Sequence, residues 1–312
     1  MKLVLPVQVR GEVEPHLPQG LEVAWYAGAP EDCAAMAEAE AAWINILEGD
    51  GQARAVEAGP KLKWVSTIQA GVNTWPLARM KQRGIVFTNG SGIAAPPIGE
   101  FVVMGMLALL KNLKGLLALE QERRWEPHLL GGSDLAGAKV LIVGYGAIGR
   151  EIGRRLAGFD VEVTGVRRSP SGEAGVIGPD DWRPRLAEFD WVILAAASTE
   201  KTRGMIGQAE LAAMKPGARL VNVARGFMID QPALIAALED GRLGGALLDV
   251  TEPEPPPRDD PIWSAPNVLL SGHSSAVGNT FYRRAAVLFL DNLDRYRRGE
   301  PLRNLVDLEA GY

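Results

Sequence analysis

Residues Lys139–Gly158 read KVLIVGYGAIGREIGRRLAG. A buried-strand pattern, KVLIV, runs directly into Gly144, Gly146 and Gly149, and a helical pattern follows. Glycines at this spacing permit a tight turn and a close approach of the backbone to a pyrophosphate, which the amide groups at the helix start would bind. The stretch therefore predicts a dinucleotide-binding βα unit. The alternative is a glycine-rich turn that binds nothing.

Further strand patterns follow this unit, with helical patterns between them. The six candidate strands are KVLIVGYG, VEVTGV, WVILAAA, RLVNVARG, GGALLDV and NVLLSGH. Strands that alternate with helices in this way are typical of a doubly wound parallel sheet. We therefore predict a Rossmann-like dinucleotide-binding domain over residues 98–284.

The first third of the chain has a similar alternation. Its candidate strands are KLVLPV, LEVAWY, AWINIL, LKWVSTI and GIVFTN, and EDCAAMAEAE and GQARAVEAG have helical patterns. The last helix, beginning near Thr280, leaves a tail too short for a domain of its own, so we expect it to return to this first unit. The fold class is then α/β, with two Rossmann-like or flavodoxin-like parallel-sheet domains. Residues 1–97 and 285–312 would then form one domain, and residues 98–284 would be inserted into it.

The junction between the two predicted domains has its own pattern. The glycines and prolines of NGSGIAAPPIGE, residues 89–100, predict a hinge. From Glu100 a mostly apolar pattern continues past Leu119, and we interpret it as one long buried helix.

Composition excludes several classes of function. The 312 residues carry a formal net charge of −5, which gives no general attraction to nucleic acid or to an anionic membrane. A single cysteine, Cys33, allows no internal disulfide, and the three histidines His16, His128 and His273 leave little material for a metal site. We expect no bound metal, a surface position for His16 and His128, and a cytosolic protein.

No membrane segment or signal peptide is predicted. At the N-terminus, Pro6 and then charged residues interrupt the apolar pattern too early for a signal peptide. The apolar run FVVMGMLALL ends at Lys111 and is shorter than a bilayer span.

Two arginines stand where a dinucleotide-binding fold usually has an acid. About 20 residues past the glycine turn, an Asp or Glu usually ends the second strand and binds the ribose hydroxyls. Here the strand VEVTGV leads into Arg167, Arg168 and Ser169. A carboxylate would repel a 2′-phosphate, whereas a guanidinium group binds it with two hydrogen bonds. We predict a preference for NADP(H) over NAD(H). The alternative is that both arginines are solvated loop residues.

Three strand ends carry groups suited to hydride-transfer chemistry. RLVNVARG ends at Arg225, GGALLDVTEPEP leads through Asp249 to Glu254, and NVLLSGH ends at His273. The carboxyl ends of parallel strands meet at one edge of a sheet, where ligands bind. A cation could clamp a 2-oxo acid and polarise its carbonyl, and a histidine oriented by a carboxylate could donate the proton. Each residue also has a structural alternative: an ion pair for Arg225, a solvated carboxylate for Glu254 and a strand cap for His273.

These stretches together resemble the D-isomer-specific 2-hydroxyacid dehydrogenase family over nearly the whole chain. The resemblance is carried by VGYGAIG, LAAMKPGARLVNVARG, ALIAALEDGRLGGALLDVTEPEP and SGHSSA. It implies that Arg225, Glu254 and His273 are the catalytic set and that Asp249 lies near the nicotinamide carboxamide. The cofactor-binding residues predicted in all are Gly144, Tyr145, Gly146, Ala147, Ile148, Gly149, Arg167, Arg168, Ser169, Ala224 and Asp249.

The same resemblance extends to the substrate. STIQAGVNTW is similar to the family's substrate loop, in which the backbone amides of Ala70, Gly71 and Val72 would bind the substrate carboxylate together with Arg225 and His273. The family's fold also implies that residues 1–97 and 285–312 are the substrate-binding domain, into which the cofactor domain is inserted. The arginine pair resembles the NADP-dependent glyoxylate and hydroxypyruvate reductases, and the family implies a homodimer. We expect NAD(P)H-dependent reduction of a small 2-oxo acid to the D-2-hydroxy acid. A phosphoglycerate or longer-chain 2-oxo acid dehydrogenase and a non-catalytic dinucleotide-sensing regulator remain as alternatives.

Overall fold

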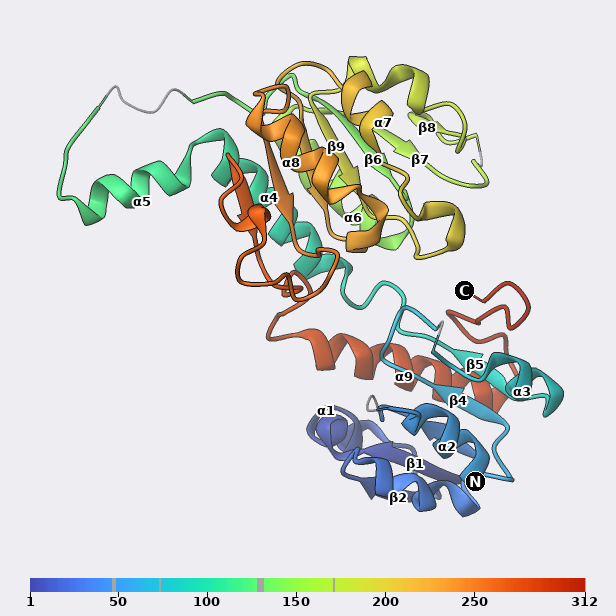
Figure 1. The fold of residues 1–312 in the computed structure, drawn as a ribbon. Coiled ribbons are helices and arrows are strands. Elements are labelled where there is room, and N and C mark those ends of the chain that lie inside the picture. The colour runs from blue at the N-terminus through green and yellow to red at the C-terminus, as the bar shows by residue number, and fades with distance from the viewer. Residues whose placement is uncertain (47–48, 73, 128–131, 171, 312) are drawn as a thin grey trace. The chain divides into compact units, whose positions relative to one another are not determined.

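The chain forms two units, each built on a parallel sheet (Figure 1). The structure, a computed structural model, describes residues 1–46, 49–72, 74–127, 132–170 and 172–311. Unit 1 comprises Met1–Ala94 and Gly278–Tyr312, and unit 2 comprises Ala95–Val277. The predicted class of two parallel-sheet α/β domains is confirmed. The chain passes between the units at 94/95 and 277/278, whereas the sequence predicts boundaries at 97/98 and 284/285.

The sheet of unit 1 has the strand order β2-β1-β3-β4-β5. Its strands are β1 (Lys2–Pro6), β2 (Glu22–Tyr26), β3 (Ala41–Trp43), β4 (Trp64–Ser66) and β5 (Val86–Thr88). Alternate residues face opposite sides, so Trp43 and Trp64 join one core while Val65 joins the other. Phe289 of α9 (Phe281–Arg298) stacks on Trp43 and Trp64, with ring centroids 4.8 and 5.3 Å away. The last helix therefore packs on the first unit.

One predicted helix of unit 1 has a different geometry. The helical segments are η1 (Val7–Val9), α1 (Arg10–Val13), η2 (Glu14–His16), η3 (Pro30–Glu38), α2 (Gly51–Ala58) and α3 (Leu77–Gln82), where η marks the 3₁₀ conformation. EDCAAMAEAE lies largely in η3 and is not the α-helix that its composition suggests. Its buried residues Cys33, Met36 and Ala39 recur every third position. That period matches the three residues per turn of a 3₁₀ helix.

The sheet of unit 2 has the order β12-β11-β10-β9-β6-β7-β8. Its strands are β6 (Lys139–Val143), β7 (Glu162–Val166), β8 (Val176–Ile177), β9 (Trp191–Leu194), β10 (Arg219–Asn222), β11 (Gly245–Leu248) and β12 (Val268–Leu270). The six predicted strands are all present, and the two-residue edge strand β8 is additional. Chain order reverses between β6 and β9, and ligands bind at such a switch point in doubly wound sheets.

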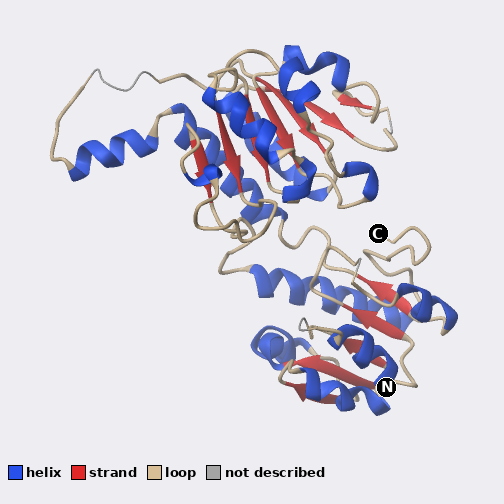
Figure 2. Cartoon of the chain, in the orientation of Figure 1, coloured by secondary structure: helices blue, strands red, loops and turns tan. Residues whose placement is uncertain are grey.

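Helices cover the viewer's side of this sheet (Figure 2). The helical segments of unit 2 are α4 (Ala95–Leu110), α5 (Leu113–Gln121), α6 (Ala147–Leu156), η4 (Ala157–Phe159), η5 (Arg183–Glu188), η6 (Glu200–Thr202), α7 (Gln208–Ala213), η7 (Gly226–Met228), α8 (Gln231–Glu239) and η8 (Pro261–Trp263).

The prediction of one long buried helix after Glu100 is wrong. The helix begins earlier, at Ala95, and breaks at Asn112, whose φ of 48° is left-handed and whose side chain accepts a hydrogen bond from the Gly115 N–H at 3.2 Å. An asparagine that caps a new helix in this way ends the previous one. The second helix, α5, is largely exposed and extends away from the sheet of its unit (Figure 1). No single helix among the described residues is long and apolar enough to cross a membrane. Among these residues, only α4 and α5 taken together have the length and composition of a membrane span, and the two helices are bent by 66° relative to one another.

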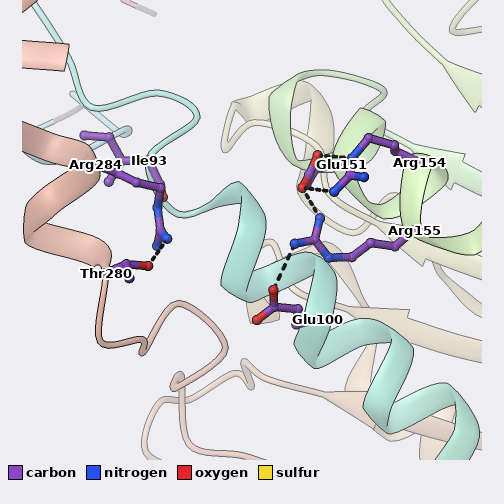
Figure 3. Close-up of polar contacts among 7 residues, drawn as sticks. All are labelled: Ile93, Glu100, Glu151, Arg154, Arg155, Thr280 and Arg284. Carbon is purple, nitrogen blue, oxygen red and sulfur yellow. Dashed lines mark hydrogen bonds and ion pairs between the residues drawn. The ribbon is translucent and has the colours of Figure 1, made fainter. Parts of the chain in front are cut away.

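Arginine side chains form hydrogen bonds and ion pairs near the two points, 94/95 and 277/278, where the chain passes between the units (Figure 3). In unit 2, Arg155 of α6 pairs with Glu151 and, at 3.0 Å, with Glu100 of α4. In unit 1, the Nε of Arg284 donates to the carbonyl of Ile93 at 2.7 Å, and its Nη1 donates to the hydroxyl of Thr280. One side chain of α9 therefore holds both chain segments at the boundary of unit 1.

Candidate active site

The glycine turn after β6 leads directly into α6, which is the strand–turn–helix order that the sequence predicts, and we call this turn the glycine cradle. A Cβ atom on Gly144 would overlap the backbone of Ala196 after β9, and one on Gly149 would overlap the carbonyl of Gly144. At Gly146, by contrast, a Cβ would meet no atom within 4 Å, so the space above this residue is open. The first amide groups of α6 have no acceptor within the helix and are available to an anion. The cradle therefore fits a dinucleotide pyrophosphate.

The two arginines lie directly beside this turn. The carbonyl of Val166, the residue before Arg167, accepts hydrogen bonds from the N–H groups of Gly144 and Tyr145 at 3.2 and 2.8 Å. The backbone N–H of Arg167 is fixed to Ile177 of β8 at 3.1 Å. Arg167 is half-buried, whereas Arg168 and Ser169 are exposed. The predicted phosphate cradle and the predicted ribose-binding strand end are thus adjacent, with Ala147 and Ile148 in the first turn of the following helix.

The histidine and the glutamate predicted to act together are in contact. Nδ1 of His273, after β12, lies 2.5 Å from Oε1 of Glu254. Their side chains are 46% and 38% exposed, so the pair is open to a ligand while its geometry is fixed. The His273 backbone is left-handed, with φ of 57°, and its N–H donates to the carbonyl of Asp249 at 2.6 Å. A histidine held through Nδ1 presents Nε2 for proton transfer.

Arg225 is exposed at the end of β10, and buried groups fix its backbone. The Asn222 side chain donates to the Arg225 carbonyl at 2.9 Å and accepts from the N–H of Ala224 at 3.0 Å. A Cβ atom on Gly226 would overlap the carbonyl of Thr251, so the loop of Arg225 packs closely on the loop that leads to Glu254. Asn222 was not predicted; the available sequence signal was a polar residue inside the apolar strand pattern RLVNV, and the structure shows that this residue is fully buried.

Asp249 holds the loop that carries His273. Its side chain is buried, and Oδ1 accepts hydrogen bonds from Ser271 Oγ at 2.7 Å and from the N–H groups of Ser274 and Ser275 at 2.8 and 3.0 Å. Oδ2 accepts from the Ser275 hydroxyl. Both carboxylate oxygens are engaged by residues flanking the histidine. The predicted contact of Asp249 with the nicotinamide carboxamide stays a prediction.

Replacing Asp249 by asparagine is expected to lower the free energy of unfolding by roughly 1–3 kcal/mol, because an amide offers one acceptor oxygen where the carboxylate offers two. Thermal unfolding of the ligand-free protein, followed by circular dichroism, measures the change. Ser271→Ala removes only one of these hydrogen bonds and is the matched control, with a smaller expected loss. An Asp249→Asn variant as stable as the Ser271→Ala variant would contradict the holding role.

The predicted substrate loop belongs to unit 1. Ala70 and Gly71 are exposed, Val72 is buried, and none of their three N–H groups donates a hydrogen bond to another described residue. The Ala70 carbonyl accepts from Asn89 at 2.9 Å, which fixes the loop. Trp75, the last residue of STIQAGVNTW, is buried against Phe87. The available N–H groups suit a carboxylate.

The other histidines lie outside this arrangement. His16 is exposed, and His128 lies outside the described residues. Within the part of the chain that the structure describes, no three His, Cys, Asp or Glu side chains form a group that could hold a metal ion.

The chain is similar to known dehydrogenases. The family model described as D-isomer specific 2-hydroxyacid dehydrogenase, NAD binding domain, matches residues 103–275. A glyoxylate reductase of Korarchaeum cryptofilum is 33% identical over 276 residues, which cover 86% of this chain and 83% of that protein. A D-3-phosphoglycerate dehydrogenase of Methanocaldococcus jannaschii is 29% identical over 257 residues, 81% of this chain but only 49% of that protein.

A solved structure has the same fold throughout. The crystal structure of a D-isomer specific 2-hydroxyacid dehydrogenase from Xanthobacter autotrophicus Py2, in complex with NADPH and MES, superposes with a TM-score of 0.80 and 29% identity. The match covers 100% of this chain and 99% of that one.

Proposed function

Because the chain belongs to the D-isomer-specific 2-hydroxyacid dehydrogenase family, we propose that it reduces a small 2-oxo acid, of the glyoxylate and hydroxypyruvate class, to the D-2-hydroxy acid with NADPH. The contact of His273 with Glu254 at 2.5 Å carries the proposal, because it supplies an oriented proton donor at the sheet edge that also bears Arg225. The bound nicotinamide cofactor supplies the hydride. Similarity to glyoxylate reductases supports the substrate class.

Residues of this chain polarise the substrate carbonyl, donate the proton and bind the substrate carboxylate. The Arg225 guanidinium polarises the carbonyl that receives the hydride, and it stabilises the negative charge that develops on oxygen. His273, with Nδ1–H held by Glu254, donates the proton from Nε2 to that oxygen. In the reverse direction, neutral His273 accepts the proton at Nε2. In unit 1, the N–H groups of Ala70, Gly71 and Val72 bind the substrate carboxylate.

Cofactor selectivity is proposed to come from the strand end after β7. The guanidinium groups of Arg167 and Arg168 and the hydroxyl of Ser169 bind the 2′-phosphate of NADPH, since charged donors hold phosphate through short, strong hydrogen bonds. The adjoining cradle at Gly144, Gly146 and Gly149 binds the pyrophosphate. The complex of the Xanthobacter relative with NADPH supports this choice of cofactor.

Replacing Arg167 by aspartate is expected to lower the ratio of kcat/KM for NADPH to that for NADH by about 10- to 100-fold, because the new carboxylate repels the 2′-phosphate and accepts from the ribose hydroxyls of NADH. Initial rates with each cofactor measure the ratio. Arg297→Asp, an equal charge change on the exposed end of α9, is the control. An unchanged ratio would identify Arg167 as a solvated loop residue.

The function itself is tested by following oxidation of NADPH, and separately of NADH, at 340 nm with glyoxylate, hydroxypyruvate, pyruvate and a bulky 2-oxo acid. Rapid NADPH turnover with the small acids is the expected result. Turnover with NADH alone would support the proposed reaction and reject the preference for NADPH. Turnover restricted to the bulky acid would favour a longer-chain 2-oxo acid dehydrogenase. No turnover with any pair would favour a dinucleotide-sensing regulator.

Phosphohydroxypyruvate belongs in the same assay, because a phosphoglycerate dehydrogenase is among the relatives, although the chain spans about half of its length. The homodimer and the cytosolic location stay predictions. Size-exclusion chromatography with light scattering tests the first.

A further inference from the structure

An arginine–glutamate pair lies beside the proposed adenosine site. Nη1 of Arg150, at the end of the first turn of α6, lies 2.6 Å from Oε1 of Glu173. The guanidinium carbon of Arg150 also lies 5.3 Å from the ring centroid of Tyr145. The side chains of Arg150 and Glu173 are 41% and 37% exposed, so solvent and ligands can reach both. Neither residue has a role in the proposed reaction.

Packing fixes this pair beside β7, the strand that leads into Arg167. Only glycine at positions 165 and 153 leaves room for the Tyr145 ring, since a Cβ atom on either would collide with it. The ring therefore lies between β7 and α6, and Arg150 stacks on it. The loop containing Glu173 connects the Arg167 strand end to β8 and folds back onto β7, where Gly165 N–H donates to the Gly175 carbonyl at 2.8 Å.

The Glu173 carboxylate interacts with both neighbouring cations. The hydrogen bond from Arg150 holds the pKa of Glu173 below its usual value, and the positive charge of Arg167 lowers that pKa further. Glu173 is therefore ionised at neutral pH and lies within the field of the arginine assigned to the 2′-phosphate. An anion bound at Arg167 would meet one fixed negative charge and, on Arg150, one further positive charge.

We propose that Glu173 and Arg150 set the cofactor preference of this protein: Glu173 competes with the 2′-phosphate for the arginines, and Arg150 is a third cation for that phosphate once Glu173 releases it. The inference rests on the assignment of the 2′-phosphate to Arg167 in the proposed function. Glu173 then weakens NADPH binding and leaves NADH binding unchanged, because NADH has no charge at this position. The pair moderates a preference that Arg167 and Arg168 would otherwise make stronger.

Isothermal titration calorimetry with adenosine 2′,5′-bisphosphate and with 5′-ADP tests the proposal without turnover. Glu173→Gln is expected to lower the Kd of the 2′,5′-bisphosphate by roughly three- to tenfold, the effect of removing one partly screened charge from a dianion. Arg150→Met is expected to raise that Kd by a similar factor. The Kd of 5′-ADP should change by less than about twofold in both variants, because its phosphates bind at the glycine cradle.

Glu188→Gln is the matched control. Arg185 pairs with Glu188 at 2.8 Å and stacks on Phe189 at 5.6 Å, so this pair has the same chemistry. It lies in η5 before β9, at the opposite edge of the sheet from the strand end of Arg167. The variant removes the same charge and should leave both Kd values unchanged.

The outcomes separate this inference from the proposed function. If Glu173→Gln leaves the ratio of the two Kd values at the wild-type level, or shifts it no more than Glu188→Gln does, the inference is overturned whatever the wild-type ratio is. If Arg150→Met raises the Kd of both ligands by the same factor, Arg150 contributes to binding at the glycine cradle and not to binding of the 2′-phosphate. Activity with 2-oxo acids is measured separately, so its absence would reject the enzyme and leave the binding result standing.

Discussion

Replacing His273 by alanine is expected to lower kcat for glyoxylate reduction by about 10²- to 10⁴-fold, the usual contribution of a general acid. KM should change little, because Arg225 and the N–H groups proposed to bind the carboxylate remain. The reason is geometric: Glu254 lies 2.5 Å from Nδ1 of His273, so Nε2 is the atom left for the proposed proton transfer. Steady-state kinetics with NADPH measure both constants, and fluorescence titration with NADPH checks that the cofactor still binds.

Two further variants make the result specific. Glu254→Gln keeps the shape of the side chain, and its carbonyl oxygen can still accept from Nδ1–H, so we expect a loss of kcat smaller than that of His273→Ala. His16→Ala removes an exposed histidine of unit 1 and should have no effect. A His273→Ala enzyme with wild-type kcat, or with a raised KM alone, would remove His273 from the role of proton donor.

Sequence patterns predicted the glycine turn, the strand ends and one side-chain contact of the candidate site. The turn at Gly144 and Gly149 is recognisable because both positions require glycine. A Cβ atom at either position would overlap backbone atoms. The strand ends carrying Arg225 and His273 were predictable because parallel strands place their carboxyl ends at one edge. The contact of Glu254 with His273 was expected from function and is observed in the geometry.

Other interactions between distant segments were not predicted from the sequence. The hydrogen bonds of Asp249 join it to serines 22 to 26 residues away, and nothing near Asp249 in the sequence indicates them. The pairing of Arg150 with Glu173, 23 residues apart, is of the same kind. Such contacts depend on how strands align in the sheet, which short patterns do not specify.

The wrong helix prediction has a local cause. The residues on both sides of Asn112 are apolar at helical spacing, and this periodicity concealed the break. The capping signal was present: asparagine is a preferred N-cap residue, and the Asn112 side chain accepts a hydrogen bond from the N–H of Gly115, three residues later. The two-residue strand β8 was missed because a strand of that length has no period to recognise.

Replacing Arg225 by alanine is expected to lower kcat by about 10²- to 10³-fold, the usual effect of losing one donor to the developing oxyanion. Unlike the histidine variant, it should also raise KM for glyoxylate by about tenfold or more, because the guanidinium is proposed to contact the substrate in the ground state as well as in the transition state. Steady-state kinetics with saturating NADPH measure both changes. The protein should fold normally, since Arg225 is exposed and its loop is fixed through Asn222 and Gly226.

Chemical rescue distinguishes lost chemistry from a disturbed loop. Guanidinium ion added to the Arg225→Ala enzyme can occupy the vacated position and should restore part of kcat, whereas it should do nothing for His273→Ala. Arg185→Ala, which replaces a half-buried arginine at the opposite edge of the sheet, should behave as the wild type. If Arg225→Ala raised KM with kcat unchanged, the guanidinium would bind the substrate without stabilising the transition state, and polarisation of the carbonyl would have to come from another group.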